Sequence, residues 1–469
     1  MNSANFINLA YLVTSILFIV GLKRMGSPAT ARQGNQMGAV GMLIAVVATL
    51  FDRQIVSYPV LIAGMVVGAV LGYVSAKRVQ MTAMPQMVAI FNGTGGGAAA
   101  LVAASEYLHG TGFGTHMMPY GAGFTTLLTA LIGGISFSGS VIAFAKLQEL
   151  MTGRPITYPG QQFVNGLVAL AMVGGLVWLT MTPQPVWVLV AFIGIAMVLG
   201  VGVVLPIGGA DMPVIIAVLN SLTGMAAATS GFVLSNNALI IAGALVGASG
   251  TLLTILMSKA MNRSLGNVLF GSFGAATVIA GGAAQEVKGS VKEFSVDDAM
   301  TVLENAQSVI IVPGYGLAVA RAQHACRELA DLLQDRGAEV RYAIHPVAGR
   351  MPGHMNVLLA EADVPYDQLM DLEDINADFA KTDVVLVLGA NDVVNPAAKT
   401  NPASPIYGMP VLNVEHARNV IVIKRSMNAG FAGIENELFY MENTMMVFGD
   451  AKKMLEQFVR ELKGSTAVH

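Results

Sequence analysis

A glycine turn in the C-terminal third of the chain contains residue types that could hold a pyrophosphate. Residues 308–312 are rich in Val and Ile and predict a buried parallel strand, and an Ala-rich stretch typical of a helix follows the turn. Gly314 would allow a tight turn, and Gly316 would let the backbone approach a ligand at the helix N-terminus. Val319 stands where the full dinucleotide-binding fingerprint has its third glycine, so a purely structural turn remains an alternative.

Two cations and a hydroxyl group at residues 424–426 could bind a phosphate monoester. Lys424, Arg425 and Ser426 lie at the end of a predicted strand, 419–424, and such groups form strong hydrogen bonds with phosphate. An NAD-selective domain usually has an acidic residue after its second strand, and the stretch 345–356 contains none. These features favour NADP over NAD, and a solvated basic patch is the alternative.

Asp392 is a further candidate for chemistry. It follows the predicted strand 383–388 in the stretch Gly389-Ala-Asn-Asp, which places a backbone turn and a carboxylate beside the expected ligand cleft. Helix capping by Asp392 is the alternative. The stretch Asn428-Ala-Gly-Phe-Ala-Gly has the composition of a mobile loop that could close over a bound cofactor.

The elements that must position these residues alternate between strands and helices. The sequence predicts strands at 308–312, 339–344, 383–388, 410–414, 419–424 and 445–448, with helices ending near 335 and 362 and a last helix from 451. This alternation predicts an α/β, Rossmann-like, doubly wound parallel sheet, whose ligands bind outside the carboxyl ends of the strands.

The rest of the chain is apolar enough to lie in a membrane. Mean hydropathy is +0.63 and charged residues make up 12% of the chain, against about 25% in soluble domains. The first 285 residues hold only four of the 29 acidic residues. We therefore predict a membrane domain at 1–262, a Gly- and Ala-rich linker at 263–290, and a soluble domain at 291–469.

Apolar stretches predict a polytopic α-helical membrane domain with about nine spans. They lie at 4–22, 36–51, 56–76, 85–105, 122–145, 163–181, 186–205, 212–233 and 238–258. Alternate connections collect most of the basic residues on one side, which has Lys23, Arg24, Arg32, Lys77, Arg78, Lys146, Arg154, Lys259 and Arg263, whereas the other has Arg53. The positive-inside rule then predicts an N-terminus outside the cell and a cytoplasmic C-terminal domain.

Polar residues at membrane depth are candidates for a path of ions or protons, because each is costly there unless paired or hydrated. Asn92 and Asn220 fall within predicted spans, and Asp211 precedes one of them. Interhelical hydrogen bonding is the alternative for the asparagines, and a helix cap is the alternative for Asp211. Protons crossing this domain would hop through water held by Asn, Ser and Thr, or use a titratable group from a partner.

Long ordered motifs in both halves resemble the beta-subunit family of bacterial proton-translocating NAD(P) transhydrogenases. The soluble half contains Pro313-Gly-Tyr-Gly-Leu-Ala-Val-Ala, His345-Pro-Val-Ala-Gly-Arg-Met-Pro-Gly-His-Met-Asn, Gly389-Ala-Asn-Asp-Val-Val-Asn-Pro, Gly408-Met-Pro-Val-Leu and Lys424-Arg-Ser-Met. The membrane half contains Gly208-Gly-Ala-Asp-Met-Pro-Val, Leu219-Asn-Ser and Lys259-Ala-Met-Asn-Arg-Ser. The resemblance covers nearly the whole chain.

The resemblance implies that the C-terminal domain holds NADP(H), reversed relative to an ordinary Rossmann site. Asp392 would be the catalytic residue, on the nicotinamide side. Besides Gly314 and Gly316, the implied contacts are Tyr315, Val347, Ala348, Gly349, Arg350, Met351, Pro352, Gly389, Ala390, Asn391, Asp392, Val393, Gly408, Met409, Lys424, Arg425, Ser426, Met427, Asn428, Ala429, Gly430, Phe431, Asp450 and Ala451. No metal site and no nucleic-acid partner are implied.

The resemblance also implies an activity and partners. The activity is reversible hydride transfer of the Si/Re-specific type between NADP(H) on this chain and NAD(H) on a separate alpha subunit, coupled to proton translocation. The assembly would be a dimer of heteromers in the bacterial inner membrane. A membrane transporter with a nucleotide-sensing cytosolic domain is the alternative from another functional class.

Asn92 is a departure from the family pattern. Some members carry a histidine at the matching position, so the group with a pKa near neutrality is missing there. We hypothesise that a membrane helix of the alpha subunit supplies a histidine, with Asn92 and Asn220 orienting water. Protonation would then change contacts at Asp211, Arg263 and the linker.

Overall fold

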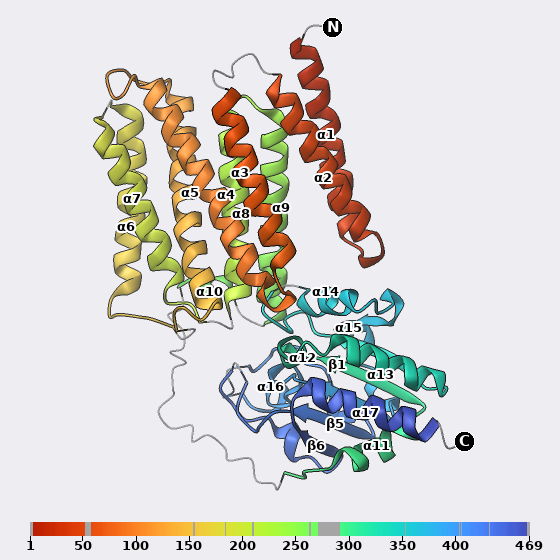
Figure 1. Ribbon diagram of the computed structural model, residues 1–469. Coiled ribbons are helices and arrows are strands. Elements are labelled where there is room, and N and C mark those ends of the chain that lie inside the picture. Colours follow the sequence, from red (N-terminus) through yellow and green to blue (C-terminus); the bar gives the residue numbers. More distant parts are fainter. Residues whose placement is uncertain are drawn as a thin grey trace. The chain divides into compact units, whose positions relative to one another are not determined.

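The computed structural model describes residues 3–51, 58–152, 155–182, 184–208, 211–261, 264–270, 291–351, 353–402, 404, 406–430 and 432–466. The chain forms two compact units. The first consists of residues 1–255 and 269–272, and the second consists of residues 256–268 and 273–469. The first unit is helical, and the second is a sheet covered by helices (Figure 1). The predicted linker residues 271–290, and Arg263, lie outside the described residues.

The described part of the first unit contains a long helix at each of the nine predicted spans. They are α1 (Ser3–Met25), α2 (Pro28–Leu50), α3 (Tyr58–Arg78), α4 (Met84–Gly110), α5 (Tyr120–Leu147), α6 (Gln161–Met181), α7 (Val186–Val204), α8 (Met212–Val233) and α9 (Asn237–Ala260). Eight of these are long and apolar enough to cross a membrane, and α2 is the exception. The first turns of α2 carry Arg32, Gln33, Asn35 and Gln36, which lower its hydropathy.

Glycines bring the helices of this unit into close contact, as small residues do in lipid. A Cβ on Gly96 of α4 would lie 3.0 Å from the carbonyl oxygen of Gly133 on α5, and one on Gly133 would lie 2.6 Å from that of Gly96. On α8, a Cβ on Gly224 would lie 2.4 Å from the amide nitrogen of Gly247 on α9. At these contacts the glycines let the helix backbones pack directly against each other.

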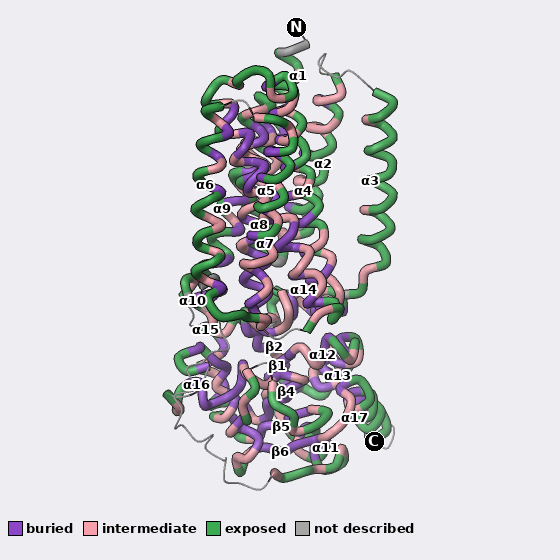
Figure 2. Tube along the Cα trace, turned by 90° about the vertical axis from the view of Figure 1, so that its left-hand side faces the viewer, coloured by how far each residue is buried: buried purple, intermediate pink, exposed green. Residues whose placement is uncertain are grey.

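The apolar core of the first unit lies between α5, α6 and α7. Its buried members include Leu127, Leu176, Leu189, Phe192 and Ala196. By contrast, α3 has no buried residue, and Figure 2 shows it exposed along nearly its whole length.

The second unit is built on a six-stranded parallel sheet with the strand order β3-β2-β1-β4-β5-β6. The strands are β1 (Ser308–Pro313), β2 (Glu339–Ile344), β3 (Leu369–Asp371), β4 (Val384–Leu388), β5 (Asn419–Lys424) and β6 (Thr444–Phe448). The helices are α11 (Val296–Glu304), α12 (Tyr315–Ala320), α13 (Gln323–Asp335), α14 (His354–Glu361), α15 (Leu372–Ile375), α16 (Ala397–Thr400) and α17 (Ala451–Thr466). This order is that of a doubly wound dinucleotide-binding sheet, as predicted.

The central strands read as continuous apolar runs because helices cover both faces of a parallel sheet. Every residue of β4 is buried, and β1 and β5 each have an uninterrupted buried stretch. The switch in strand order lies between β1 and β4, so the turns that follow these two strands meet at the carboxyl edge.

The prediction of a strand at 410–414 was wrong. The backbone groups of this segment form hydrogen bonds with side chains and with one loop residue, and not with a neighbouring strand. Nε2 of His345 donates to the Pro410 carbonyl at 2.7 Å, and the Asn376 side chain bonds to the backbone of Val411 and Asn413. The amide of Leu412 donates to the Val393 carbonyl at 2.9 Å. The edge strand β3, which the sequence analysis missed, takes the outer place in the sheet.

The helix predicted after the glycine turn is two helices. The chain adopts a left-handed conformation at Arg321, with φ 51° and ψ 45°, so α12 ends there and α13 begins at Gln323. Non-glycine residues seldom adopt this conformation. The amide of Ala322 donates to the Leu317 carbonyl at 3.2 Å and closes the end of α12.

Candidate functional site

The turn after β1 packs directly on the turn after β4. A Cβ on Gly314 would lie 2.4 Å from the carbonyl oxygen of Gly389, and a Cβ on Gly316 would lie 2.6 Å from the Cα of Gly389. The amide of Gly314 donates to the Leu388 carbonyl at 2.9 Å, and that of Gly316 to the Gly389 carbonyl at 3.0 Å. Glycine at these positions therefore lets the backbones of the two turns come into direct contact.

This geometry corrects the role predicted for Gly314. Its φ of −121° is accessible to any residue, so the turn itself does not require glycine there. The need comes from the close approach of Gly389, whose own φ of +64° lies in the left-handed region. The amides of Gly314 and Gly316 already donate hydrogen bonds to the carbonyl groups of Leu388 in β4 and of Gly389 in the turn after it.

Asp392 lies in the 3-10 helix η5 (Asp392–Val394), directly after the β4 turn. Its Oδ2 accepts a hydrogen bond from the amide of Ala432 at 3.0 Å, and a Cβ on Gly430 would lie 2.6 Å from its Oδ1. The Asn436 side chain donates to the carbonyl oxygen of Asn391 at 3.0 Å. The loop after β5 therefore packs against the turn that carries Asp392, and Asp392 binds this loop instead of capping a helix.

Lys424, Arg425 and Ser426 lie at the carboxyl end of β5, beside β4. Arg425 and Ser426 are exposed, whereas Lys424 is partly buried. The Lys424 ammonium donates to the Asn428 carbonyl and lies 4.8 Å from the centroid of the Phe439 ring. Burial lowers the pKa of Lys424, and the Asp392 carboxylate partly opposes this shift. A phosphate bound here would contact Lys424 at the end of β5 and the exposed donor groups of Arg425 and Ser426.

His345 and His354, which were not singled out as site residues, hold the loop between β2 and α14. Nδ1 of His345 accepts from the amide of Val347 at 3.2 Å, and Nδ1 of His354 accepts from the amide of Arg350 at 3.0 Å. Both rings are almost fully buried. The Arg350 guanidinium lies 4.5 Å from the centroid of the Tyr315 ring, which joins this loop to the start of α12.

Other predicted contacts gather around this loop. Met409, with Val411, Ile406 and Ala398, forms a buried cluster against which Val347 and Ala432 pack. Gly408 has a φ of +80°, and its amide donates to the Ala398 carbonyl at 2.8 Å. The segments of chain near residues 347, 409 and 432 are thereby brought together at the carboxyl edge of the sheet.

The remaining predicted contacts have varied surroundings. The side chain of Asp450 accepts from the amides of Lys452 and Lys453 at the start of α17, and Ala451 is buried. Ala390 and Val393 lie in the core of the sheet, against which Met427 packs, while Asn428 and Ala429 are exposed. Ala348 is buried, and Gly349 and Met351 are partly so. Pro352 and Phe431 lie outside the described residues.

We expect His345 to make stability of the second unit depend on pH. Burial lowers the pKa of His345 to about 4 from 6.5, and the hydrogen bond to Pro410 opposes the shift. The neutral ring therefore contributes stability above pH 6.5, and this is lost as the pH falls toward 4. A shift of this size corresponds to about 3 kcal/mol.

The measurement is the thermal unfolding midpoint of the wild-type chain and of His345→Gln between pH 6.5 and 4. The variant should lose less stability over this range than the wild type. The matched control is His324→Gln, since His324 is exposed. Equal slopes for the wild type and His345→Gln would contradict the assignment.

In the membrane unit, Asn92 joins a buried polar cluster between α4, α5 and α8. Its side-chain amide donates to Oγ of Ser140 at 2.9 Å and, more weakly, to Oγ of Ser136 at 3.4 Å. Oγ of Ser136 also lies 2.5 Å from Oγ1 of Thr223 and donates to the Leu219 carbonyl at 3.0 Å. Ser136 and Ser140 were missed from the sequence, although they lie four residues apart on one helix face.

Asn220 and Asp211 do not belong to this cluster. Asn220 is partly buried, and its side chain makes no hydrogen bond to any residue that the structure describes. Asp211 is buried ahead of α8, where its side chain makes no capping hydrogen bond. Asn92 therefore makes interhelical hydrogen bonds, and its part in a proton path stays a prediction. The capping alternative for Asp211 is not supported.

The parallel sheet and the apolar helices together define a membrane protein with a Rossmann-like domain. Comparisons with known proteins agree. The model of the NAD(P) transhydrogenase beta subunit family matches residues 7–461. Two relatives, both named NAD(P) transhydrogenase subunit beta and both from Rhodospirillum rubrum, are 52% identical over 458 residues, with 97% of this chain and 98% of each relative covered. The chain therefore belongs to the NAD(P) transhydrogenase beta-subunit family.

Proposed function

We propose that this chain binds NADP(H) and exchanges hydride with NAD(H) held by an alpha subunit, in step with proton translocation. The observation that carries the proposal is the set Lys424, Arg425 and Ser426 at the carboxyl edge of a parallel sheet, next to Asp392. A phosphate monoester needs such charge and donors, and NADP carries one where NAD has a hydroxyl.

The chain's own residues would bind and orient the nucleotide, which supplies the hydride-carrying nicotinamide ring. Arg425 and Ser426 are exposed for a phosphate, and Lys424 gains from an added negative charge because burial disfavours its ammonium form. The Asp392 carboxylate accepts a hydrogen bond from the amide of Ala432, and this bond holds the carboxylate in one orientation. The loop at 428–433 would cover the ligand and exclude water.

Proton movement would be coupled to nucleotide affinity. Hydride exchange between two nicotinamide nucleotides is nearly balanced, so a proton gradient can drive it only by changing the affinity of the NADP(H) site, and this coupling is reciprocal. The Asn92 cluster would hold water in the membrane unit, with the titratable group, a histidine, supplied by an alpha-subunit helix. Asn220 would orient water together with Asn92, and protonation would change contacts at Asp211, Arg263 and the linker.

The assembly would be a dimer of alpha and beta heteromers in the bacterial inner membrane. The distribution of basic residues supports an N-terminus outside the cell and a cytoplasmic nucleotide domain. A titratable group in the alpha spans is required by the proposal, and its absence would count against it.

The test uses the purified complex with its alpha subunit in lipid vesicles. We expect NADH to reduce an NADP analogue with proton movement, and Asn220→Leu to abolish both while NADP binding is retained, because Leu cannot hold water. The matched control is Asn165→Leu, which removes a partly buried asparagine that donates to the Gly202 carbonyl at 2.9 Å. Nucleotide binding without hydride transfer would favour a transporter with a sensing domain.

A further inference from the structure

Near the end of α5, Lys146 is a cation buried inside the membrane unit. The residue is 4% exposed, and its ammonium donates hydrogen bonds to the carbonyl groups of Leu205, the C-cap residue of α7, and of Ile207 at 2.7 Å. An ammonium group is costly to bury in lipid unless it is paired or hydrogen-bonded. A lysine at this position therefore needs a physical reason.

Uncharged side chains bind the carbonyl groups at neighbouring helix ends. Nε2 of Gln86, in the first turn of α4, donates to the Leu147 carbonyl at the end of α5 at 3.0 Å. The side-chain amides of Gln161 and Asn165 on α6 both donate to the Gly202 carbonyl in the last turn of α7, at 3.1 and 2.9 Å. An uncharged donor is sufficient at each of these places.

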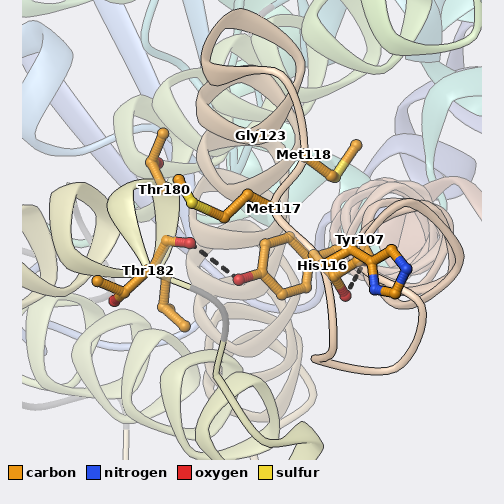
Figure 3. A pocket seen from close by; sticks show the side chains of 9 residues that line it. Tyr107, His116, Met117, Met118, Gly123, Thr180 and Thr182 are labelled. Atoms are coloured by element: carbon orange, nitrogen blue, oxygen red, sulfur yellow. Dashed lines mark hydrogen bonds between the residues drawn. The ribbon is translucent and has the colours of Figure 1, made fainter.

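The end of α6 is bound in the same way. Figure 3 shows the pocket where α4 ends and α5 begins, in which the Tyr107 hydroxyl donates to the Leu179 carbonyl, in the last turn of α6, at 2.9 Å. The last carbonyl groups of a helix need such partners because the helix itself supplies none for them. Since neutral groups fill this need for α5, α6 and part of α7, the charge of Lys146 calls for a further explanation.

The segment that Lys146 binds leads into Asp211. The structure describes no donor other than Lys146 for the Ile207 carbonyl. Directly beyond Ile207, the amide of Asp211 donates to the Gly208 carbonyl at 3.1 Å and closes a turn, and Asp211 is only 5% exposed. The Lys146 ammonium thus anchors the chain at the residue that precedes the turn with the buried Asp211 carboxyl group.

A charged donor suits this anchor for two reasons. A hydrogen bond from an ammonium group is roughly twice as strong as one between neutral groups. The ammonium also lies at the C-terminal end of α7, where the helix dipole presents partial negative charge. Lys146 is itself held in place, because Gln86 binds the carbonyl of the next residue, Leu147. The anchor is therefore fixed at both of its ends.

We propose that Lys146 is a positioning residue for proton-coupled hydride transfer, which fixes the place of the Asp211 carboxyl group at the start of α8. The inference rests on the proposed function, in which protonation changes contacts at Asp211. Such a change reaches the rest of the chain only if the backbone at Asp211 does not yield to it. The bonds from Lys146 to Leu205 and Ile207 supply this resistance.

The test compares hydride transfer with and without an imposed proton gradient, in the complex with its alpha subunit reconstituted in vesicles. Lys146→Met keeps the length of the side chain but removes its charge and both hydrogen bonds, so most of the stimulation by the gradient should be lost. Lys146→Arg keeps a charged donor and should restore the stimulation. A purely structural defect would lower the two rates equally, so the ratio of the rates with and without the gradient is the measured quantity.

Two control variants should keep the wild-type ratio. Lys23→Met removes an exposed lysine from the last turn of α1. Asn165→Leu leaves Gln161 bound to the Gly202 carbonyl, so the end of α7 keeps its partner on α6. If Lys146→Met does not assemble, Lys146→Gln, which keeps an uncharged donor, takes its place, and its ratio should also fall.

A wild-type ratio in Lys146→Met, or in Lys146→Gln where that variant replaces it, would overturn this inference alone. An equal loss in Lys146→Arg would do the same, because the charged donor is then not what matters. A wild-type complex whose hydride transfer does not respond to any proton gradient would overturn the proposed function together with it.

Discussion

Replacing Lys424 and Arg425 together by glutamine should lower the affinity for NADP⁺ by at least about a hundredfold. Each charged hydrogen bond to a phosphate contributes about 1.5–3 kcal/mol, and a tenfold change in affinity corresponds to about 1.4 kcal/mol. Arg425 is exposed at the end of β5, and Lys424 lies beside it against Phe439. Affinity for NAD⁺, which lacks the phosphate, should change little, so the preference for NADP⁺ should disappear.

The measurement is titration calorimetry of the purified chain with each nucleotide. Arg418→Gln is the control for loss of a cation elsewhere, because Arg418 precedes β5 and pairs with Asp383 at 2.8 Å, at the opposite edge of the sheet. That variant should bind NADP⁺ like the wild type. An unchanged ratio of NADP⁺ to NAD⁺ affinity in the double variant would show that the phosphate is bound elsewhere.

Gly316→Ala should destabilise the second unit and weaken nucleotide binding at the same time. The added Cβ would lie 2.6 Å from the Cα of Gly389, and a backbone atom cannot turn aside as a flexible side chain can. Overpacking of this kind costs about 1–3 kcal/mol. Because Asp392 follows Gly389 by three residues, the strain should also displace the carboxylate.

Thermal unfolding and NADP⁺ titration of Gly316→Ala would measure both effects. The control is Gly464→Ala near the end of α17, where a Cβ would meet nothing within 4 Å. That change should leave the unfolding midpoint the same or raise it slightly, because alanine favours a helix. A stable Gly316→Ala protein with normal nucleotide affinity would contradict the tight crossing of the two turns.

The sheet could be predicted well because its strands are short apolar runs between turn residues. The bounds of β2 and β5 agree with the prediction, and β1 and β4 differ from it by one residue. The segment 410–414 has the same apolar character but pairs with His345 and Asn376 instead of a strand. A local pattern cannot reveal such a side-chain partner, since the partners lie 35 and 65 residues away in sequence.

The site was predicted less completely than the fold. Charge made Lys424 and Arg425 candidates, and the cost of a polar group in lipid made Asn92 one. Ser136 and Ser140 carry no such signal, because serines are common in membrane helices and matter here only through their contacts with Asn92. His345 and His354 act through backbone amides, which the sequence does not show.

A buried cation lies at the end of the membrane bundle where α5 finishes. The ammonium of Lys146 is almost inaccessible and donates to the carbonyl groups of Leu205 and Ile207, which close α7. It therefore fastens the last turn of one helix to the segment that leads into Asp211 and α8. A tilt of α5 would therefore strain these two hydrogen bonds, so Lys146 couples the end of α5 to the end of α7 and to Ile207 beyond it.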